Sequence, residues 1–296
     1  MKVLKCYMLS AVFAAFATEV VGEYYTYNAS LDVVFDFYSR RNQKSPEVIT
    51  IGSSLLHSHF MMKNLVVILV HGLGGNGDDE FNRSVRKAIF NTMDVNVISV
   101  DWGIGAQGTY KDAFENIPST AAEIVKFINW LEENGVKHSD LRLVGFSMGG
   151  QMAGFVARGM DQKLPFVMAL DPAAPWFGNN TIKAEDADYV EVIHTSSLGI
   201  SQRGGHNDFY PNGGTSQTGC TDNGCNHFRS YVYLAESLAA GSAMSRLIGQ
   251  SCRSVQEAMA AGCTSSRHLA LGGLEPKNKL GVFYLETNPS PPFAKG

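Results

Sequence analysis

Residues 141–151 read LRLVGFSMGGQ and constrain the fold more than any other stretch of the chain. A largely apolar run leads into Ser147, which stands between Gly145 and Gly149, and a helix-compatible segment follows. This Gly-x-Ser-x-Gly pattern is typical of a nucleophile elbow, a strained strand-to-helix turn that exposes a serine hydroxyl above a sheet. The alternative is a buried strand followed by an ordinary tight turn. Because so short a pattern recurs by chance, the rest of the sequence has to support it.

The remaining sequence predicts an α/β fold with a largely parallel central sheet flanked by helices. Continuous apolar runs, which mark strands covered on both faces, lie at 65–70, 96–100, 141–146, 166–170 and 189–195. Edge strands are expected at 31–39 and 281–287, and helices at 119–135, directly after Ser147, and at 227–241. No repeat or linker divides this alternation, so we expect residues 18–296 to form one domain.

Composition excludes some classes of function. With 296 residues, of which 45% are hydrophobic, the chain can bury a substantial core. The net charge of -4 and the absence of a basic patch argue against nucleic-acid binding.

The N-terminus, MKVLKCYMLSAVFAAFATEVVG, predicts a secretory signal peptide. Lys2 and Lys5 precede an apolar run at 6–17, and residues 15–17 fit a small-residue cleavage pattern. We expect cleavage after residue 17, or as late as residue 22. The run is shorter than the roughly 20 residues that a membrane-spanning helix needs, so we expect a secreted, extracellular protein without a transmembrane anchor.

The cysteines and sequons suit the same export route. If Cys6 leaves with the leader, Cys220, Cys225, Cys252 and Cys263 remain, and an even number in an exported chain implies two disulfides. Three connectivities are possible, and the close spacings favour 220 with 225 and 252 with 263. A zinc site is the alternative, but the paired C-x-x-C motifs of such sites are missing. Asn28, Asn82 and Asn179 begin N-glycosylation sequons.

A catalytic serine needs a base and an orienting carboxylate, and in sheets of this kind they follow it in the order Asp or Glu, then His. Asp171 ends the strand predicted at 166–170, at the edge where open α/β sheets bind ligands. Capping of the following loop is its alternative role. The histidines after Asp171 are His194, His206, His227 and His268. Chain order does not choose among them, although His194 falls inside a predicted strand and is expected in the core.

Residues 71–75, HGLGG, follow the strand predicted at 65–70 and suit an oxyanion hole. Glycines let backbone N–H groups approach the negative oxygen of a tetrahedral intermediate. We expect the amides of Leu73 and Met148 to be the two donors. A phosphate-binding loop is the alternative, but the Lys-Ser/Thr of a P-loop is missing.

Taken together, these motifs resemble the pancreatic-lipase-like family of lipases and phospholipases A1, within the α/β-hydrolase fold. The matching segments are HGLGGN (71–76), VDWG (100–103), GFSMGG (145–150), LDPAAP (170–175), VIHT (192–195), GHNDFYPNGG (205–214), GC (219–220) and CNHFRSY (225–231), which span nearly the whole chain after the leader. The resemblance implies Ser147 as nucleophile, Asp171 as acid and His227 as base, with His206 structural. It implies no cofactor and no metal.

Two departures from the family pattern bear on the substrate. Phe146 stands where the family usually has His, which is expected to alter the floor of the pocket. The cysteine pair that closes a long lid in triacylglycerol lipases of the family corresponds to Cys220 and Cys225, which enclose only residues 221–224. With a short loop after Asp171 and no second domain expected, the pattern is closest to insect phospholipases A1 and neutral lipases with a reduced lid.

The sequence therefore predicts a secreted serine esterase that acts on lipids at a lipid–water interface, with the sn-1 ester of phospholipids as the preferred substrate. A triacylglycerol lipase or galactolipase is the alternative. A lipid-binding or yolk-type storage protein is an alternative of another class, but such relatives usually lack a triad residue. Trp176 and Phe177 are expected either to touch the lipid surface or to pack onto the core. The acidic residues Glu185, Asp186 and Asp188 are interpreted as a solvated turn rather than a calcium site.

Overall fold

The computed structural model describes residues 25–53, 55, 58–239 and 246–295. The predicted signal peptide, with Cys6, lies outside the described residues. So do residues 240 and 241, at the end of the helix predicted over 227–241.

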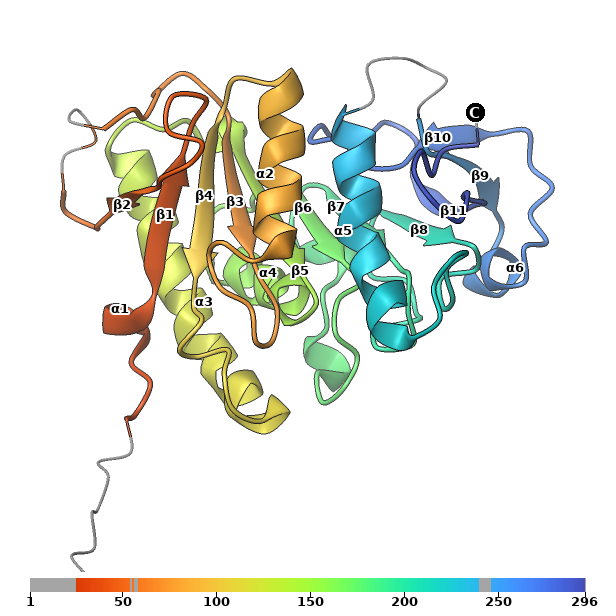
Figure 1. Cartoon of the computed structure of the whole chain (residues 1–296), viewed down its shortest axis with the longest axis horizontal. Helices are drawn as coiled ribbons and strands as arrows, with labels where there is room; N and C mark the ends of the chain where they lie inside the picture. The colour runs from red at the N-terminus through yellow and green to blue at the C-terminus, as the bar shows by residue number, and fades with distance from the viewer. Residues whose placement is uncertain (1–24, 54, 56–57, 240–245, 296) are drawn as a thin grey trace, which may run out of the picture.

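One continuous sheet runs through the described residues (Figure 1). Its strands are β1 (Val34–Tyr38), β2 (Glu47–Ile49), β3 (Val66–Val70), β4 (Asn96–Asp101), β5 (Leu141–Phe146), β6 (Val167–Leu170), β7 (Val190–Ile193), β8 (Asn207–Pro211), β9 (Ile248–Cys252), β10 (His268–Ala270) and β11 (Gly281–Leu285). The spatial order is β10, β9, β11, β8, β7, β6, β5, β3, β4, β1, β2. The seven strands between β4 and β11 in this spatial order, both included, are parallel to their neighbours. At one end β1 and β2 pair antiparallel, and at the other end β9 and β10 pair antiparallel.

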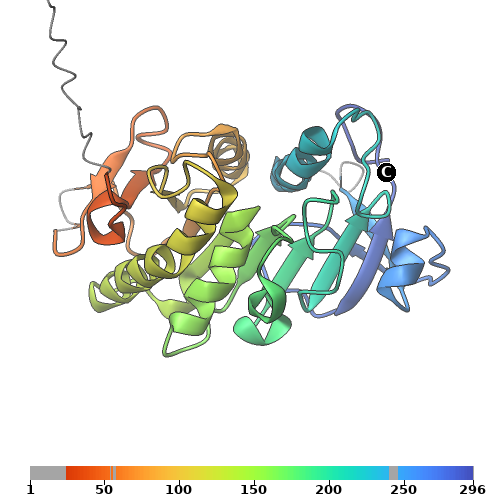
Figure 2. The same ribbon diagram turned by 90° about the horizontal axis from the view of Figure 1, so that it is seen from below.

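Helices cover both faces of this sheet. The α-helices are α1 (Ala29–Asp32), α2 (Glu80–Thr92), α3 (Tyr110–Glu133), α4 (Met148–Gly159), α5 (Asn223–Ala239) and α6 (Val255–Met259), with 3-10 turns η2 (His138–Asp140), η3 (Gly178–Asn180) and η4 (Ala184–Asp186). Viewed from below, α3 and α4 lie on one face while α2 and α5 lie on the other (Figure 2). This layering confirms the predicted α/β fold.

Strand β3 shows why the central strands read as continuous apolar runs. Val66, Ile68 and Val70 belong to the core cluster that contains α3 and α4, whereas Val67 and Leu69 belong to the cluster of α2 and α5. All five side chains are buried. Since full burial of such a side chain contributes on the order of 1.5–3 kcal/mol, both faces of the sheet stabilise the fold.

The five central strands predicted from apolar runs correspond to β3 to β7, and the strands predicted at 31–39 and 281–287 correspond to β1 and β11. Neither of these two is an edge strand, so that part of the prediction is wrong. Strand β1 pairs with β2 on its outer side, and β11 lies between β8 and β9. Residues 31–39 also begin with the end of α1 rather than with extended chain.

Helix α4 begins directly after Ser147, as predicted, but the other two predicted helices begin earlier than the sequence pattern indicated. Thr109 and Asp112 form a reciprocal capping box that starts α3 at Tyr110, nine residues before the predicted start. The helix continues through Pro118. Helix α5 begins at Asn223 rather than at His227.

Two disulfides join Cys220 to Cys225 and Cys252 to Cys263. In the part of the chain that the structure describes, no helix is both long enough and apolar enough to cross a bilayer.

The structure contradicts Asn82 as a glycan acceptor. Its side chain is 0% exposed, and its amide nitrogen donates to the Asn76 carbonyl (3.0 Å) and to Asp79 (3.1 Å). A glycan on this nitrogen would replace one of its two N–H hydrogens and would have to fit at a fully buried position. Asn28 and Asn179 are exposed and stay predictions.

Candidate active site

Ser147 occupies a strained turn between β5 and α4. Its backbone has φ 57° and ψ −121°, a conformation that L-residues rarely adopt and that nucleophile elbows require. The two flanking glycines are required sterically: a Cβ on Gly145 would lie 2.1 Å from the Gly149 carbonyl oxygen, and one on Gly149 would lie 2.1 Å from the Val70 carbonyl oxygen. The close contact between β5, α4 and β3 therefore depends on the sequence pattern itself.

Asp171 follows β6 at the same edge of the sheet and is fully buried. Its backbone N–H donates to the Ile193 carbonyl (2.7 Å), which fixes it beside β7, and its φ is 43°. One carboxylate oxygen, Oδ1, accepts from the backbone N–H groups of Thr195 (2.7 Å) and Ser196 (3.1 Å). The other, Oδ2, faces His227.

His227 lies near the start of α5, and its Nδ1 is 2.6 Å from Asp171 Oδ2. The ring of Phe146, the residue before Ser147, packs 4.6 Å from the imidazole centroid. His227 and the serine turn are therefore in contact through Phe146. Because the carboxylate can only accept, Nδ1 carries the proton and Nε2 is left with a free lone pair.

The loop at 71–75 is held by Trp102, from the VDWG segment. The Trp102 backbone N–H donates to His71 Nε2 (3.2 Å), and the indole N–H donates to the His71 carbonyl (3.0 Å). Met148 is the first residue of α4, so its N–H has no acceptor within the helix. Among the described residues, the Leu73 N–H meets no acceptor either, whereas the Gly74 N–H donates to Ala106.

The other candidate histidines are engaged elsewhere. His194 is buried between Asp208 (2.9 Å) and the Ile200 carbonyl (2.8 Å). His206 accepts from the Val190 N–H (3.0 Å) where β7 begins, at the opposite end of that strand from Asp171, and burial lowers its pKa. His268 lies in β10, on the outer edge of the sheet.

The segment between Cys220 and Cys225 leads into the first turn of α5 rather than forming a lid. Residues 223 and 224 already belong to the helix, and Asp222 accepts from the Cys225 N–H (2.8 Å) as a cap. Asn223 donates to the Ser197 hydroxyl (2.7 Å), which ties this turn to the loop after β7. The disulfide thus anchors the helix that carries His227.

Five exposed apolar side chains, which we call the apolar rim, follow strand ends or the start of α5 at this edge: Leu73, Ile104, Trp176, Leu198 and Phe228. Trp176 is 59% exposed, although its ring contacts Tyr110 and Phe114. Phe177 is only 2% exposed and packs on Phe114, so the expectation that it could touch lipid is wrong and its alternative, core packing, holds.

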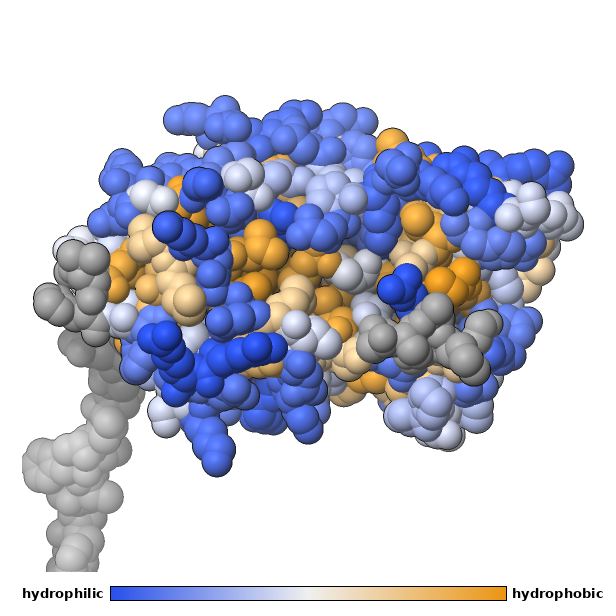
Figure 3. Space-filling view, turned by 90° about the horizontal axis from the view of Figure 1, so that it is seen from above, coloured by the Kyte–Doolittle hydropathy of each residue, from blue (hydrophilic) through white to orange (hydrophobic). Residues whose placement is uncertain are grey.

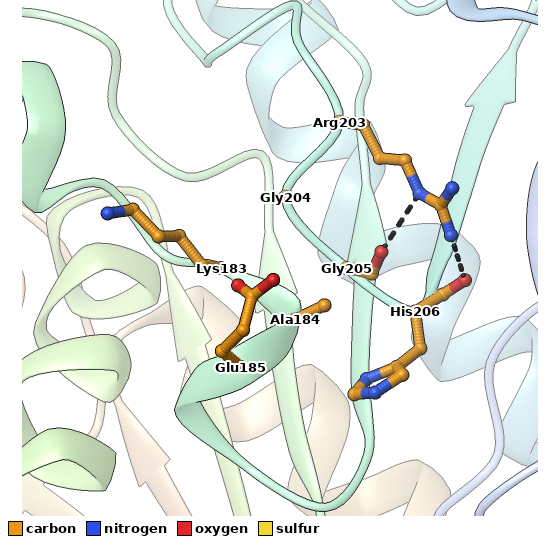
Figure 4. Close-up of a pocket in the computed structure, with 7 residues that line it drawn as sticks. All are labelled: Lys183, Ala184, Glu185, Arg203, Gly204, Gly205 and His206. Carbon is orange, nitrogen blue, oxygen red and sulfur yellow. Dashed lines mark hydrogen bonds between the residues drawn. The ribbon is translucent and has the colours of Figure 1, made fainter.

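The opposite edge, seen from above in Figure 3, shows mainly hydrophilic residues around an apolar area. A separate pocket lies beside the starts of β7 and β8 and is lined by Lys183, Ala184, Glu185, Arg203, Gly204, Gly205 and His206 (Figure 4). The side chains of Lys183 and Arg203 point away from each other. The Arg203 guanidinium donates hydrogen bonds to the carbonyls of Gly205 (3.1 Å) and His206 (2.8 Å). These charges do not converge on a ligand.

A pair of carboxylates lies beneath the 71–79 loop. A Cβ on Gly77 would meet Asp36 Oδ2 at 2.6 Å and Asp101 Cβ at 3.0 Å, so both side chains crowd one backbone position. Burial, with the nearby charge of Asp101, raises the pKa of Asp36 to about 6. The folded state therefore holds this proton more tightly than the unfolded chain, and folding stability is lost as pH rises from about 4 through about 6.

Replacing Asp36 by Asn is expected to stabilise the protein above pH 6. Since Asp36 is partly exposed, the gain is about 1 kcal/mol at pH 8 and disappears at pH 4. Urea unfolding at both pH values measures it, with the exposed Asp94→Asn as control. An equal gain at pH 4 and pH 8 would rule out this origin.

Comparison with known proteins fits this geometry. A model of the family described as "Lipase" matches residues 18–293. The chain is 31% identical over 241 residues to the pancreatic triacylglycerol lipase of Sus scrofa, covering 70% of this chain and 54% of that protein. It is 31% identical over 267 residues to pancreatic lipase-related protein 2 of Bos taurus, covering 79% of this chain and 56% of that protein. The chain thus spans a little over half the length of these relatives.

Among solved structures, a ferulic acid esterase of Anaeromyces mucronatus is 14% identical, with 59% of this chain and 77% of that chain covered and a TM-score of 0.35. The family model spans nearly the whole chain, as the quoted motifs do, and both confirm the resemblance found in the sequence. The chain belongs to the lipase family, in its pancreatic-lipase-like branch of the α/β-hydrolases.

Proposed function

We propose that this protein hydrolyses acyl esters of lipids through a covalent acyl-serine intermediate. Ser147 is the nucleophile, His227 the general base and Asp171 the group that orients the imidazole. The observation that carries the proposal is the 2.6 Å contact between His227 Nδ1 and Asp171 Oδ2, next to the strained Ser147 turn.

In the proposed mechanism these side chains act in sequence. Asp171 keeps the proton on Nδ1, so Nε2 accepts the Ser147 proton as the hydroxyl attacks the ester carbonyl. The protonated imidazole then donates that proton to the leaving alcohol, and later activates the water that hydrolyses the acyl-serine. The N–H groups of Leu73 and Met148 receive the oxyanion, because neither is committed to another acceptor in the described part of the chain.

For the substrate we propose the sn-1 ester of a phospholipid. The support is the segment at 221–224, which leads into α5 and is too short to cover the site as a long lid would. Triacylglycerol hydrolysis is the second candidate, favoured by the similarity to pancreatic triacylglycerol lipases. A storage or lipid-carrying role is disfavoured because it has no need of a strained serine beside a buried Asp–His pair.

We propose that the apolar rim is the surface that meets the lipid–water interface. Its members surround the edge that carries Ser147, so a lipid surface in contact with them would present ester groups to the site. We propose that the protein is secreted and that Asn28 and Asn179, both exposed, accept glycans. The two disulfides fit an extracellular protein.

Hydrolysis of defined lipids tests the proposal. Purified protein is given vesicles of phosphatidylcholine with different acyl chains at sn-1 and sn-2, and separately a triacylglycerol emulsion, with Ser147→Ala as the blank. Release of the sn-1 chain alone supports phospholipase A1. Release from the emulsion alone favours the lipase, and no release from either lipid contradicts lipid ester hydrolysis.

Catalysis is expected to proceed without the opening of a lid. A gated lipase exposes its cleft only at a lipid surface, which supplies the free energy of opening. Here the residues that correspond to the lid lead into α5 and are held by a disulfide and by Asn223, so we expect no exchange between open and closed states. The rate with a short-chain ester should saturate smoothly through its solubility limit, and a sharp rise at that limit would contradict the prediction.

A further inference from the structure

Ser196 lies just beyond β7 and makes two contacts with the carboxylate of Asp171. Its backbone N–H donates to Oδ1 (3.1 Å), and its hydroxyl donates to Oδ2. Oδ2 is also the oxygen that accepts from His227 Nδ1. The Ser196 side chain is 3% exposed and its Oγ is 3.5 Å from that nitrogen.

The positions of the protons fix the direction of these bonds. The Leu198 N–H donates to Ser196 Oγ (3.1 Å), so the hydroxyl accepts there and has one proton left to give. His227 Nδ1 already carries a proton and cannot accept it. The hydroxyl proton therefore goes to Asp171, whose two oxygens each accept two hydrogen bonds, from Thr195 and Ser196 on Oδ1 and from Ser196 and His227 on Oδ2.

We infer that Ser196 is a positioning residue for the Asp171–His227 pair, an inference that rests on the proposed function. Its hydroxyl fixes the rotation of the carboxylate so that Oδ2 points at Nδ1. It also shares the negative charge of that oxygen with the imidazole. A fully buried carboxylate is sensitive to the loss of one donor, because no water can replace it.

Replacing Ser196 by Ala should lower kcat by about tenfold and leave KM within about twofold, since the contact acts on the base and not on the substrate. The acidic limb of the pH profile of kcat/KM should move to higher pH, because an unshared Oδ2 holds the protonated imidazole more strongly. Ser196→Thr keeps the hydroxyl and should recover most of the rate. Ser201→Ala, an exposed serine of the same loop, is the matched control.

A second measurement needs no substrate. The Nδ1 proton of His227 is expected to give a proton NMR resonance at low field, and this resonance should shift in Ser196→Ala but not in Ser201→Ala. A Ser196→Ala protein with wild-type kcat and an unmoved resonance would overturn the inference. If the wild type hydrolyses no lipid ester, the proposed function fails, yet the resonance still decides whether Ser196 shares Oδ2.

Discussion

Ser147→Ala is expected to remove ester hydrolysis almost completely, lowering kcat/KM by about 10⁴-fold or more, while the melting temperature stays close to that of the wild type. Without the hydroxyl no acyl-enzyme forms, and only the oxyanion donors and substrate binding remain. Stability should not change, because alanine meets the same backbone strain at φ 57° that serine meets.

Kinetics with a soluble ester and calorimetry on the same samples check this expectation. Ser201→Ala, which removes an exposed serine hydroxyl from the loop between β7 and β8, is the control. A Ser147→Ala protein that is folded and still hydrolyses the ester at the wild-type rate would contradict the mechanism.

His227→Ala is expected to reduce kcat/KM by a similar factor, about 10⁴-fold, because it removes the base that takes the Ser147 proton. His206→Ala should leave kcat/KM within about twofold. That ring accepts from the Val190 N–H, so its loss should instead lower the free energy of unfolding by about 1 kcal/mol.

The two histidine variants are compared for kcat/KM and for urea unfolding. The assignment requires the activity loss to follow His227 and the stability loss to follow His206. The reverse pattern, or an equal loss of activity in both, would show that the base has been assigned to the wrong histidine.

The central strands could be predicted because burial on both faces of the sheet requires a continuous run of apolar residues. Strand β8 could not, since Asn207 and Asp208 are buried polar residues within it. Asn207 donates to Tyr189 and to the Lys279 carbonyl, and Asp208 Oδ1 lies 2.9 Å from His194 Nε2. These partners come from other segments of the chain, so no window of sequence around 207–211 reveals that the polar groups are satisfied.

In the candidate site, too, some residues could be predicted from the local sequence and others could not. The serine turn is visible in the sequence because its requirement for Gly145 and Gly149 is local. The choice of His227 over His206 needed the family resemblance, because only the topology places one at the carboxyl ends of the strands and the other near their starts. The role of Ser196 could not be predicted from the sequence, because its hydroxyl reaches Asp171 only after β6 and β7 pair.

Local sequence patterns gave wrong predictions for Asn82 and Phe177 because burial in the folded protein determines what these side chains can contact. The sequon at Asn82 has the required residues, yet the buried asparagine side chain donates to the Asn76 carbonyl and to Asp79 near the start of α2. Trp176 and Phe177 are adjacent aromatic residues whose rings both contact Phe114, but only Phe177 is buried, whereas Trp176 is 59% exposed. Which of two neighbours faces the core depends on the turn geometry after β6.

The most direct test of the central claim is to trap the acyl-enzyme step. An alkyl phosphonate ester, which phosphonylates activated serines, is incubated with the full protein, and the modified peptide is identified by mass spectrometry. We predict a single adduct, on Ser147, and none in the His227→Ala protein, because the hydroxyl needs its base to attack. An adduct on another serine, or undiminished labelling without His227, would contradict the account.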